Sequence, residues 1–347
     1  MTLSPEFVLP PGQSLTDKFP VVGETAPAPG LSAASCRVDI TGLVATPLSL
    51  SLAELLALPQ TERVADIHCV TGWSRRAITL RGWPLASILA LAGVKAEAAF
   101  VRFVAHSARG HDSALPLALA LADTWLVTAI DGEPLSAEHG GPLRTVTPGR
   151  YFYKSLKWLK KIELLDHDQL GYWERESAYH NDADFRLEQR FDESRIATAD
   201  ETAAFRDATD FVPWSSRVLL KARLGGWQPK TADLSGIQAK YCSLRNAKLA
   251  GVSLRGANLS LSNCEGADLR DADFTAADLE GASFAGADLR GARMVDCFLS
   301  ATRFFRDFAN GKRLAAQVEG LSLVRPRGLL EAQAAFLREA GVIDIGT

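Results

Sequence analysis

The sequence predicts an α+β protein of two parts, in which a mixed α/β domain precedes a β structure built from short repeats. Strand-like alternation and short helical segments fill the chain up to about Asp192, and a five-residue apolar period runs from Ala232 to about Arg306. A chain of 347 residues is long enough for each part to bury its own core. The expected divisions are a first domain over 1–195, a linker over 196–230, a repeat domain over 231–306 and a C-terminal cap over 307–347.

The composition is that of an ordinary folded protein, with 47% hydrophobic and 23% charged residues. The 38 basic and 41 acidic residues give a net charge of −3, which removes the general electrostatic reason for binding nucleic acid or an anionic membrane. The longest apolar stretch, 114–130, is interrupted by Pro116 and Asp123, so no spanning helix is expected. Residues 1–10 show no signal peptide pattern, and the cytoplasm is therefore the expected compartment.

The elements of the first domain follow from local patterns. Cys36, Val38 and Ile40 alternate with polar residues, which predicts a strand with one buried face over 36–40. Proline precedes and glycine follows the apolar stretch 85–91, which predicts a short helix there. Similar helices are expected over 51–58 and 116–121. No glycine-rich nucleotide-binding motif follows a strand, so nucleotide folds receive no support.

The repeat has an apolar residue at the centre of each five-residue unit and a small residue two places earlier in nearly every unit. Neither a helical period of 3.6 nor a strand period of 2 gives this pattern. The fifteen centres are Leu234, Ala239, Leu244, Leu249, Leu254, Leu259, Cys264, Leu269, Phe274, Leu279, Phe284, Leu289, Met294, Leu299 and Phe304.

Units such as Ala257-Asn258-Leu259 and Ala267-Asp268-Leu269 resemble the pentapeptide-repeat family. The resemblance implies a right-handed quadrilateral β-helix with four pentapeptides per coil. Between 231 and 306 nine acidic residues balance nine basic ones, which argues against mimicry of DNA and favours a structural or assembly role. Solenoid ends need capping, and the amphipathic stretch 329–340, which Gly341 follows, is the expected capping helix.

One cysteine lacks a packing explanation. Cys36 lies on the apolar face of a predicted strand, and Cys242, Cys264 and Cys297 occupy inward positions of the repeat. Cys69 instead lies where a strand-like run enters a turn with glycine, in the sequence His-Cys-Val-Thr-Gly-Trp-Ser. From the pattern alone it is either a small buried thiol or a functional one.

A basic segment follows later in the chain. Between His139 and Ile162 there are six basic residues and no acidic one, although the whole protein is acidic. Converging arginine, lysine and serine side chains can hold a phosphate, whereas lysines on an edge strand can also be a solvated face that deters aggregation. Charge alone leaves both interpretations open.

Taken together, these segments resemble the sulfite oxidase family of molybdenum enzymes over about 15–190. The matching segments are 68–74, 139–144, 154–159 and 172–181, in the family's order. The resemblance implies one molybdenum-molybdopterin per chain, with Cys69 as the only protein ligand of the metal. The residues that it places at the cofactor are His68, Cys69, Thr71, His139, Arg144, Lys154, Ser155, Lys157 and Lys18.

The resemblance also bears on the substrate. Tyr179 aligns with the family's active-site tyrosine and is the expected hydrogen-bond donor on the substrate side. The arginine that helps to hold sulfite in the animal and plant enzymes is Thr16 in this chain, and Lys18 replaces a histidine. Specificity for sulfite is therefore not expected.

The favoured function is oxygen-atom transfer on a small sulfur or nitrogen oxo compound, with electrons exchanged with a separate donor or acceptor because no haem-binding segment is present. The alternative is an assembly protein, in which the repeat mediates contacts and the molybdopterin fold is catalytically silent. Cys69, Arg144 and Lys157 are all retained, which favours the enzyme. The repeat is expected to pack against the first domain or a second copy of the chain, so a homo-oligomer is one expectation.

Overall fold

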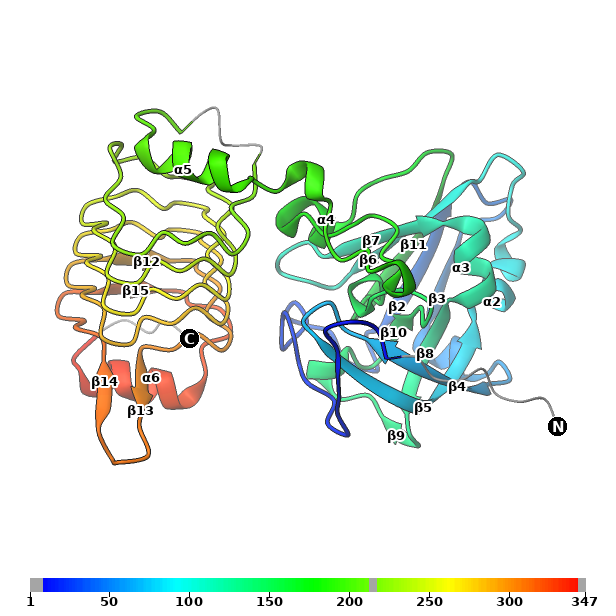
Figure 1. The fold of residues 1–347 in the computed structure, drawn as a ribbon. Coiled ribbons are helices and arrows are strands. Elements are labelled where there is room, and N and C mark those ends of the chain that lie inside the picture. The colour runs from blue at the N-terminus through cyan, green and yellow to red at the C-terminus, as the bar shows by residue number, and fades with distance from the viewer. Residues whose placement is uncertain (1–8, 212–216, 343–347) are drawn as a thin grey trace. The chain divides into compact units, whose positions relative to one another are not determined.

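In the computed structural model, the described residues are 9–211 and 217–342, and they form two units that divide after Asp192 (Figure 1). Each unit has its own buried core, as the chain length predicted. No helix in these two ranges is apolar and long enough to serve as a membrane span.

A six-stranded sheet of the first unit carries the site. Strand β5 lies at its centre and pairs with β1 in parallel and with β4 and β8 in antiparallel orientation. The turn between β4 and β5 is consequently held by one of the longest ladders in the unit. The strands are β1 (Ser14–Leu15), β4 (Thr61–His68), β5 (Trp73–Pro84), β8 (Trp125–Ile130), β9 (Glu133–Pro134) and β10 (Arg144–Val146).

A second, five-stranded sheet has the order β3-β2-β11-β6-β7. In β2, Val38 and Ile40 are buried while their neighbours are more exposed, which confirms the alternation seen in the sequence. The strands are β2 (Arg37–Gly42), β3 (Leu48–Ser51), β6 (Phe100–Ala105), β7 (Asp112–Pro116) and β11 (Leu159–Leu165).

The expected short helices are present. Helix α1 (Leu52–Leu56) begins at a capping box, in which Ser51 and Glu54 satisfy each other's backbone amides. Helices α2 (Leu85–Ala92) and α3 (Leu117–Asp123) contact each other, and both follow a proline (Figure 1). The first unit also contains the helical segments η1 (Ala137–His139), η2 (Phe152–Lys154), α4 (Tyr172–Ser177) and η3 (Phe185–Leu187), and η4 (Glu193–Arg195) opens the second unit.

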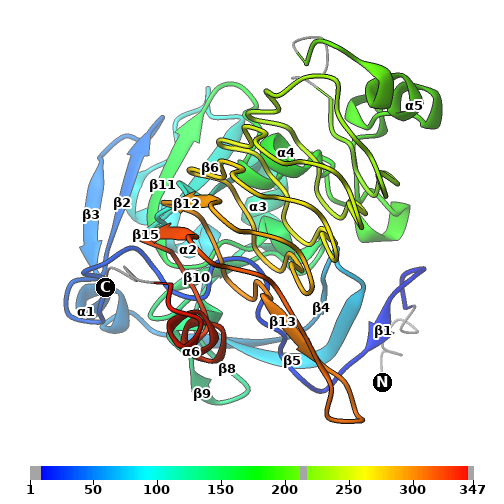
Figure 2. The ribbon, with the colours of Figure 1, turned by 90° about the vertical axis from the view of Figure 1, so that its left-hand side faces the viewer.

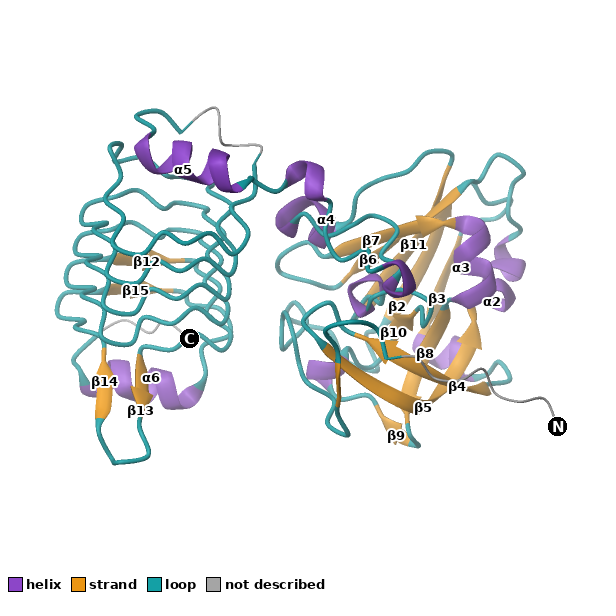
Figure 3. Ribbon diagram, viewed as in Figure 1, coloured by secondary structure: helices purple, strands orange, loops and turns teal. Residues whose placement is uncertain are grey.

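The second unit is a stack of coils in which parallel bridges join residues twenty positions apart. Gln238 bridges Asn258, which in turn bridges Asp278. A spacing of twenty residues places four pentapeptides in each coil. Most of these pairings are single bridges, and Figure 3 accordingly draws few strands in the stack.

The expected linker over 196–230 is wrong. Helix α5 (Ala199–Asp207) fills part of it and packs Phe205 into the core of the second unit. Beyond the helix the coil has already begun, because Val218 bridges Gln238 and Leu224 is buried in the same core. Leu219, Leu224 and Leu234 fall in the five-residue register, but neither Leu219 nor Leu224 follows an Asp or Asn. Arg217 replaces the small residue before Leu219, and Pro229 interrupts the series of apolar centres.

The end of the repeat at 306 is also too early. The bridge spacing changes from 20 to 29 at the pairs Asp288–Gln317 and Phe298–Arg327, so nine residues are inserted and the coil then resumes. The insertion is a hairpin of β13 (Phe305–Asp307) and β14 (Arg313–Ala315), which projects from the stack (Figure 2). Strand β12 (Arg293–Val295) pairs with β15 (Ser322–Val324) beyond it.

Helix α6 (Glu331–Glu339) lies within the stretch where a cap was expected. Its Leu337 is fully buried in the core of the coils, and Phe336 packs against that core. Apolar side chains of the helix thus belong to the same core as those of the coils.

Candidate active site

The Cys69 loop is the tight turn that connects β4 with β5. The Cys69 N–H donates to the Trp73 carbonyl at 2.8 Å, and the Gly72 N–H donates back to the Cys69 carbonyl at 3.0 Å. Gly72 has a φ of +103°, which residues with a side chain rarely adopt. The side chain of Gln13 also donates to the Cys69 carbonyl at 2.8 Å. Three hydrogen bonds thus hold the backbone that carries the thiol, and Cys69 is buried.

The neighbours of Cys69 fix its surroundings. Thr71 Oγ1 lies 3.1 Å from Cys69 Sγ, within hydrogen-bond distance. His68 Nδ1 lies 2.8 Å from Ser74 Oγ, and the ring of Phe185 packs 4.0 Å from the imidazole. Burial lowers the pKa of His68 to about 4, so its imidazole is neutral at pH 7.

An N-terminal arm lies along β5 beside this loop. The Thr16 N–H donates to the Ser74 carbonyl at 3.0 Å, and Phe19 stacks in parallel on the ring of His139 at 4.3 Å. Lys18, which the sequence placed at the cofactor, is exposed, and its backbone N–H donates to the Thr16 hydroxyl. The arm therefore joins the Cys69 side of the site to the basic segment, and does so through Phe19 rather than through Lys18.

The basic segment reaches the Cys69 loop through a backbone bridge between His68 and Tyr151. Several basic side chains lie near His139. Burial is the main cause that lowers the pKa of His139. The carboxylate of Glu138 opposes this shift, and the cations Arg144, Lys157 and Arg75 add to it. The surroundings of His139 are therefore suited to an anion.

Lys157 is held close to His139 by the backbone. Its ammonium donates to the carbonyls of Val22 and Glu24 at 3.1 and 2.8 Å. A Cβ added to Gly140 would come within 2.9 Å of Lys157 Cα, so the two segments meet only because residue 140 is glycine. This close approach explains a glycine directly after His139.

Arg144 and Ser155 have backbone partners. The fully buried Arg144 guanidinium donates to the carbonyls of Thr145, His139 and Ser155 at 3.3, 2.7 and 3.1 Å. The Ser155 hydroxyl accepts from the Thr147 N–H at 3.0 Å. Burial lowers the pKa of Arg144 to about 9. Both side chains thereby hold the loops that present His139 and Lys157.

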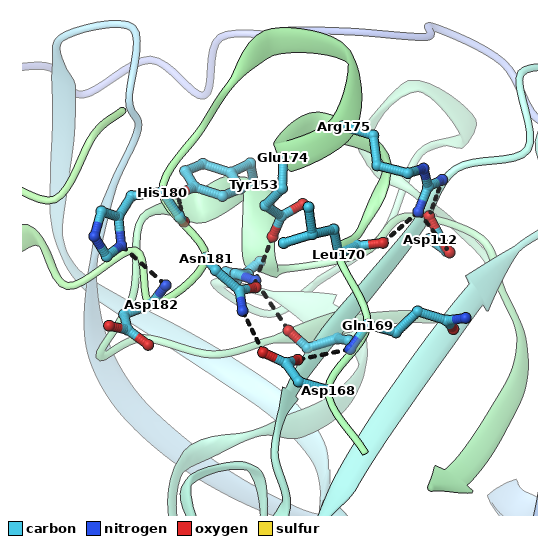
Figure 4. Close-up of polar contacts among 12 residues, drawn as sticks. Asp112, Tyr153, Asp168, Gln169, Leu170, Glu174, Arg175, His180, Asn181 and Asp182 are labelled. Atoms are coloured by element: carbon cyan, nitrogen blue, oxygen red, sulfur yellow. Dashed lines mark hydrogen bonds and ion pairs between the residues drawn. The ribbon is translucent and has the colours of Figure 1, made fainter. Parts of the chain in front are cut away.

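Lys154 is buried against the segment that contains α4. Its ammonium donates to the Ala114 carbonyl at 2.9 Å and to Asn181 Oδ1 at 3.2 Å, and it forms an ion pair with Glu174. Figure 4 shows Asn181 lying between Glu174 and Asp168. The sequence-based assignment of Lys154 to the cofactor stays a prediction, and the structure directs its ammonium toward these three oxygens.

Tyr179 comes to the Cys69 loop from the same segment. It is buried in an aromatic cluster with Val70 and Tyr151, and its ring centroid lies 4.8 Å from that of Tyr153 and 5.9 Å from that of Trp173. Because Val70 directly follows Cys69, the expected ligand and the expected substrate-side donor belong to one region of the fold.

Sequence reasoning missed two residues that hold this region together. Besides binding the Cys69 carbonyl, Gln13 accepts a hydrogen bond from the Ser74 hydroxyl. Arg190 donates to the carbonyls of Val70 and Pro11, at 2.9 and 2.5 Å. Both contacts link residues more than fifty positions apart, and no local pattern in the sequence marks either residue.

The donor set fits molybdopterin. A buried cysteine thiol is a soft ligand of the kind that suits a thiophilic metal, and the cations around His139 suit a phosphate. The bridge between His68 and Tyr151 brings the two features together within one unit.

Comparisons with known proteins agree with this geometry. The family model described as "Oxidoreductase molybdopterin binding domain" matches residues 25–173, and "Pentapeptide repeats" match 232–275 and 267–304 with eight copies in all. The "Uncharacterized oxidoreductase YuiH" of Bacillus subtilis is 42% identical over 185 residues, which are 53% of this chain and 91% of that protein.

Other relatives match over shorter shares. The "Protein-methionine-sulfoxide reductase catalytic subunit MsrP" of Gluconobacter oxydans is 35% identical over 40% of this chain and 49% of its own length. The "Putative protein-methionine-sulfoxide reductase subunit YedZ1" of Azospira oryzae is 33% identical over 42% of this chain and 54% of its own length. The chain thus spans about half the length of these two relatives.

Two solved structures are similar to separate parts of the chain. The sulfane dehydrogenase SoxCD of Paracoccus pantotrophus is 27% identical, covers 44% of this chain and 43% of its own, and has a TM-score of 0.40. A pentapeptide repeat protein from Nostoc is 24% identical. The match covers 42% of this chain and 95% of that protein, with a TM-score of 0.22. From the match to the family model and the relative matched over nearly its whole length, this chain belongs to the family of oxidoreductases with a molybdopterin-binding domain and carries pentapeptide repeats after that domain.

Proposed function

We propose that the first unit transfers an oxygen atom to or from a small sulfur or nitrogen oxo compound. The observation that carries this proposal is the Cys69 loop, which presents one buried thiol next to the cluster that contains Tyr179. When bound, the molybdenum-molybdopterin cofactor would supply a metal that exchanges two electrons as the oxygen atom is transferred. The protein supplies the thiolate ligand, the orientation of the cofactor and the residues that meet the substrate.

The residues divide into groups by their contacts. Cys69 is the metal ligand of the proposal, and the Thr71 hydroxyl, which lies within hydrogen-bond distance of its sulfur, would donate to the thiolate. In the proposal, His139 and Lys157 contact the phosphate of the cofactor. Arg144 holds their loops in place by donating hydrogen bonds to backbone carbonyls such as that of His139. Tyr179 faces the substrate. In this proposal His68 and Ser155 act through the loops that they hold, since their polar atoms already have partners in the protein.

The surroundings of Tyr179 favour an uncharged sulfur compound such as a sulfoxide. Tyr151, Tyr153 and Trp173 make this region aromatic, and sulfur packs favourably against aromatic rings. The residue aligned with the sulfite-binding arginine is Thr16, whose hydroxyl accepts from a backbone amide. Two of the relatives are named as methionine-sulfoxide reductase subunits, which supports the same class of substrate and a separate protein as electron partner.

The test is the purified full-length protein and its Cys69→Ser variant. Molybdenum and pterin content are measured first, followed by reduction of methionine sulfoxide or dimethyl sulfoxide with a reduced viologen dye as electron source. We expect about one molybdenum per chain in the wild type and no turnover in Cys69→Ser. Cys36→Ser is the matched control, because Cys36 is also a buried thiol and lies directly before β2. Full activity of Cys69→Ser would refute the assignment.

For the second unit we propose the finer architecture of a right-handed quadrilateral β-helix closed by α6, with a role in assembly. The twenty-residue bridge spacing and the burial of Leu337 support it. An experimental structure of the full chain would test the hand of the coil and the position of the cap. The mass of the protein in solution would test assembly, and a strictly monomeric chain that binds no partner would contradict that role.

A further inference from the structure

The surroundings of Lys154 set it apart from the other basic residues of its segment. It is the last residue of η2 and is fully buried. An ammonium has three N–H donors, and the three oxygens in reach come from different elements: Ala114 on β7, Glu174 on α4 and Asn181 in the segment after α4. One side chain thus ties three parts of the first unit together.

The cost of burying these charges makes the arrangement specific. A buried ion costs several kcal/mol unless a partner and further hydrogen bonds compensate for the lost water. Burial raises the pKa of Glu174, and Asp112 adds to that rise, whereas Lys154 opposes it. The pair is therefore favourable only when Lys154 and Glu174 meet at close range, which fixes α4 in one position.

The segment after α4 is fixed by the same group of contacts, which Figure 4 draws. The Asn181 amide accepts from Lys154 and donates to Asp168 at 2.5 Å. The Tyr153 hydroxyl donates to the His180 carbonyl at 2.6 Å. Tyr179 directly precedes both anchored residues, so the position of its ring beside Val70 depends on them.

We propose that Lys154 and Glu174 are positioning residues of the oxidoreductase, which hold Tyr179 beside the Cys69 loop, and that Lys154 does not contact the cofactor. This inference rests on the proposed function, because it assigns Tyr179 to the substrate side of that site. It differs from a role in phosphate binding, in which Lys154 would hold the cofactor and leave Tyr179 unaffected.

The first experiment is the Lys154→Met variant of the full-length enzyme. Methionine keeps the length of the side chain and removes all three hydrogen bonds. We expect molybdenum and pterin content to stay at the wild-type level and kcat to fall about tenfold or more, since a small displacement of a reacting group costs one to two orders of magnitude. Loss of pterin with an unchanged kcat per bound molybdenum would overturn the proposal, as would wild-type kcat and KM.

A double-variant cycle tests whether Lys154 acts through Tyr179. In Tyr179→Phe the expected substrate-side hydroxyl is missing, so adding Lys154→Met should lower kcat no further. Multiplication of the two losses would show independent roles and would overturn the proposal. Glu174→Gln leaves the buried ammonium of Lys154 without its charged partner, and we expect kcat to fall as in Lys154→Met while pterin content stays at the wild-type level.

Two further variants cover the case in which Lys154→Met does not fold. Asn181→Ala removes only the link to the segment that follows Tyr179, and kcat should fall with little loss of thermal stability. Arg175→Gln is the matched control, because Arg175 also ties α4 to β7 through Asp112 but lies nearer the surface. Its kcat should remain that of the wild type. An equal fall in both variants would show that general loosening of α4 is the cause and would overturn the proposal.

Hydrogen exchange of the cofactor-free protein separates this inference from the proposed function. We expect amides of 172–182 to exchange faster in Lys154→Met and Asn181→Ala than in the wild type, while those of β4 and β5 do not change. Unchanged exchange over 172–182 would overturn the positioning role, whatever the activity. A wild-type protein without oxygen-atom transfer but with this exchange pattern would refute the function and leave the anchoring of the segment supported.

Discussion

The two units of this chain bury polar groups in opposite ways. In the second unit the inward positions are apolar or small, and the same local arrangement recurs from coil to coil. In the first unit, charged side chains such as Arg144 and Lys154 are fully buried and bind oxygens from distant segments. The second unit is thus specified by a short sequence pattern that repeats, and the first unit by long-range contacts that each occur once.

The recurrence in the second unit extends to its polar atoms. Thr302 Oγ1 and Ser262 Oγ donate to the carbonyls of Leu279 and Ala239, 23 residues earlier in each case, at 2.7 Å. Cys297 Sγ makes the same contact with the carbonyl of Phe274. A polar residue at this corner therefore meets the same type of partner in different coils, which explains why Ser, Thr and Cys can replace alanine there.

The largest effect is expected from placing a charge in the repeated core. Leu269 is 1% exposed, and Leu269→Asp would bury a carboxylate among apolar side chains with no oxygen or nitrogen to compensate. The loss of the leucine alone costs about 2–5 kcal/mol, and the unpaired carboxylate adds to it, which approaches the whole stability of a domain. We expect little soluble protein, measured as yield after expression.

Arg270→Asp is the control for that variant. The adjacent side chain of Arg270 is about half exposed and pairs with Asp268 across the surface of the coil. Its replacement should leave the yield near that of the wild type and alter the mass of the protein in solution at most. Wild-type behaviour of both variants, or collapse of Arg270→Asp alone, would show that the inward and outward positions have been exchanged.

An intermediate effect is expected in the first unit when a buried charge is removed. Arg144→Ala leaves the carbonyls of His139 and Ser155 without their donor, and we expect the unit to lose about 3–5 kcal/mol. Pterin content should fall at the same time, because His139 and Lys157 lose their support. Calorimetry and pterin analysis measure the two effects. Normal pterin content together with normal stability would contradict the role of Arg144 in holding these loops.

The difference between the units also explains what the sequence could predict. The register of the repeat from Leu234 to Phe304 followed from a local period, and all of these centres are buried. The coil formed by Leu219 and Leu224 was missed because neither centre follows an Asp or Asn and Pro229 interrupts the series of apolar centres, and the hairpin over 305–315 was missed because it interrupts the period. Prediction failed at the two places where the sequence departs from the five-residue repeat.

In the first unit the sequence identified Cys69 by elimination and by resemblance, and the structure places it in a tight turn with Tyr179 in the neighbouring cluster. The partners of Lys154 could not be predicted, since Ala114 and Asn181 lie 40 and 27 positions away. A basic residue in a basic segment has the same local pattern whether it binds the phosphate of a cofactor or a buried carboxylate of the protein. Only the fold distinguishes the two.

The smallest effect is expected from acid, and it should act on the second unit. The Arg270 and Arg290 guanidinium groups donate to Asp268 and Asp288 of their own coils, and Arg270 also forms an ion pair with Asp288 of the next coil. These contacts lower the pKa of both carboxyl groups. A carboxyl with a lowered pKa in the folded state contributes stability that is present above its unfolded pKa of 3.8 and is lost as the pH falls through the folded value. The second unit should therefore lose stability below about pH 4.

Calorimetric scans of the full chain at pH 7, 4.5 and 3 measure this loss. Because the arginines are about half exposed, solvent screens these pairs, and we expect the melting temperature of the second unit to fall by a few degrees at most. The Asp268→Asn and Asp288→Asn double variant removes two of the titrating groups and should reduce the change between pH 4.5 and 3. Asp273, Asp296 and Asp307, whose pKa values are also lowered, should retain the rest. If the double variant keeps the full acid dependence, other groups cause it, and the ladder of arginines and aspartates stabilises the coil no more than isolated surface charges would.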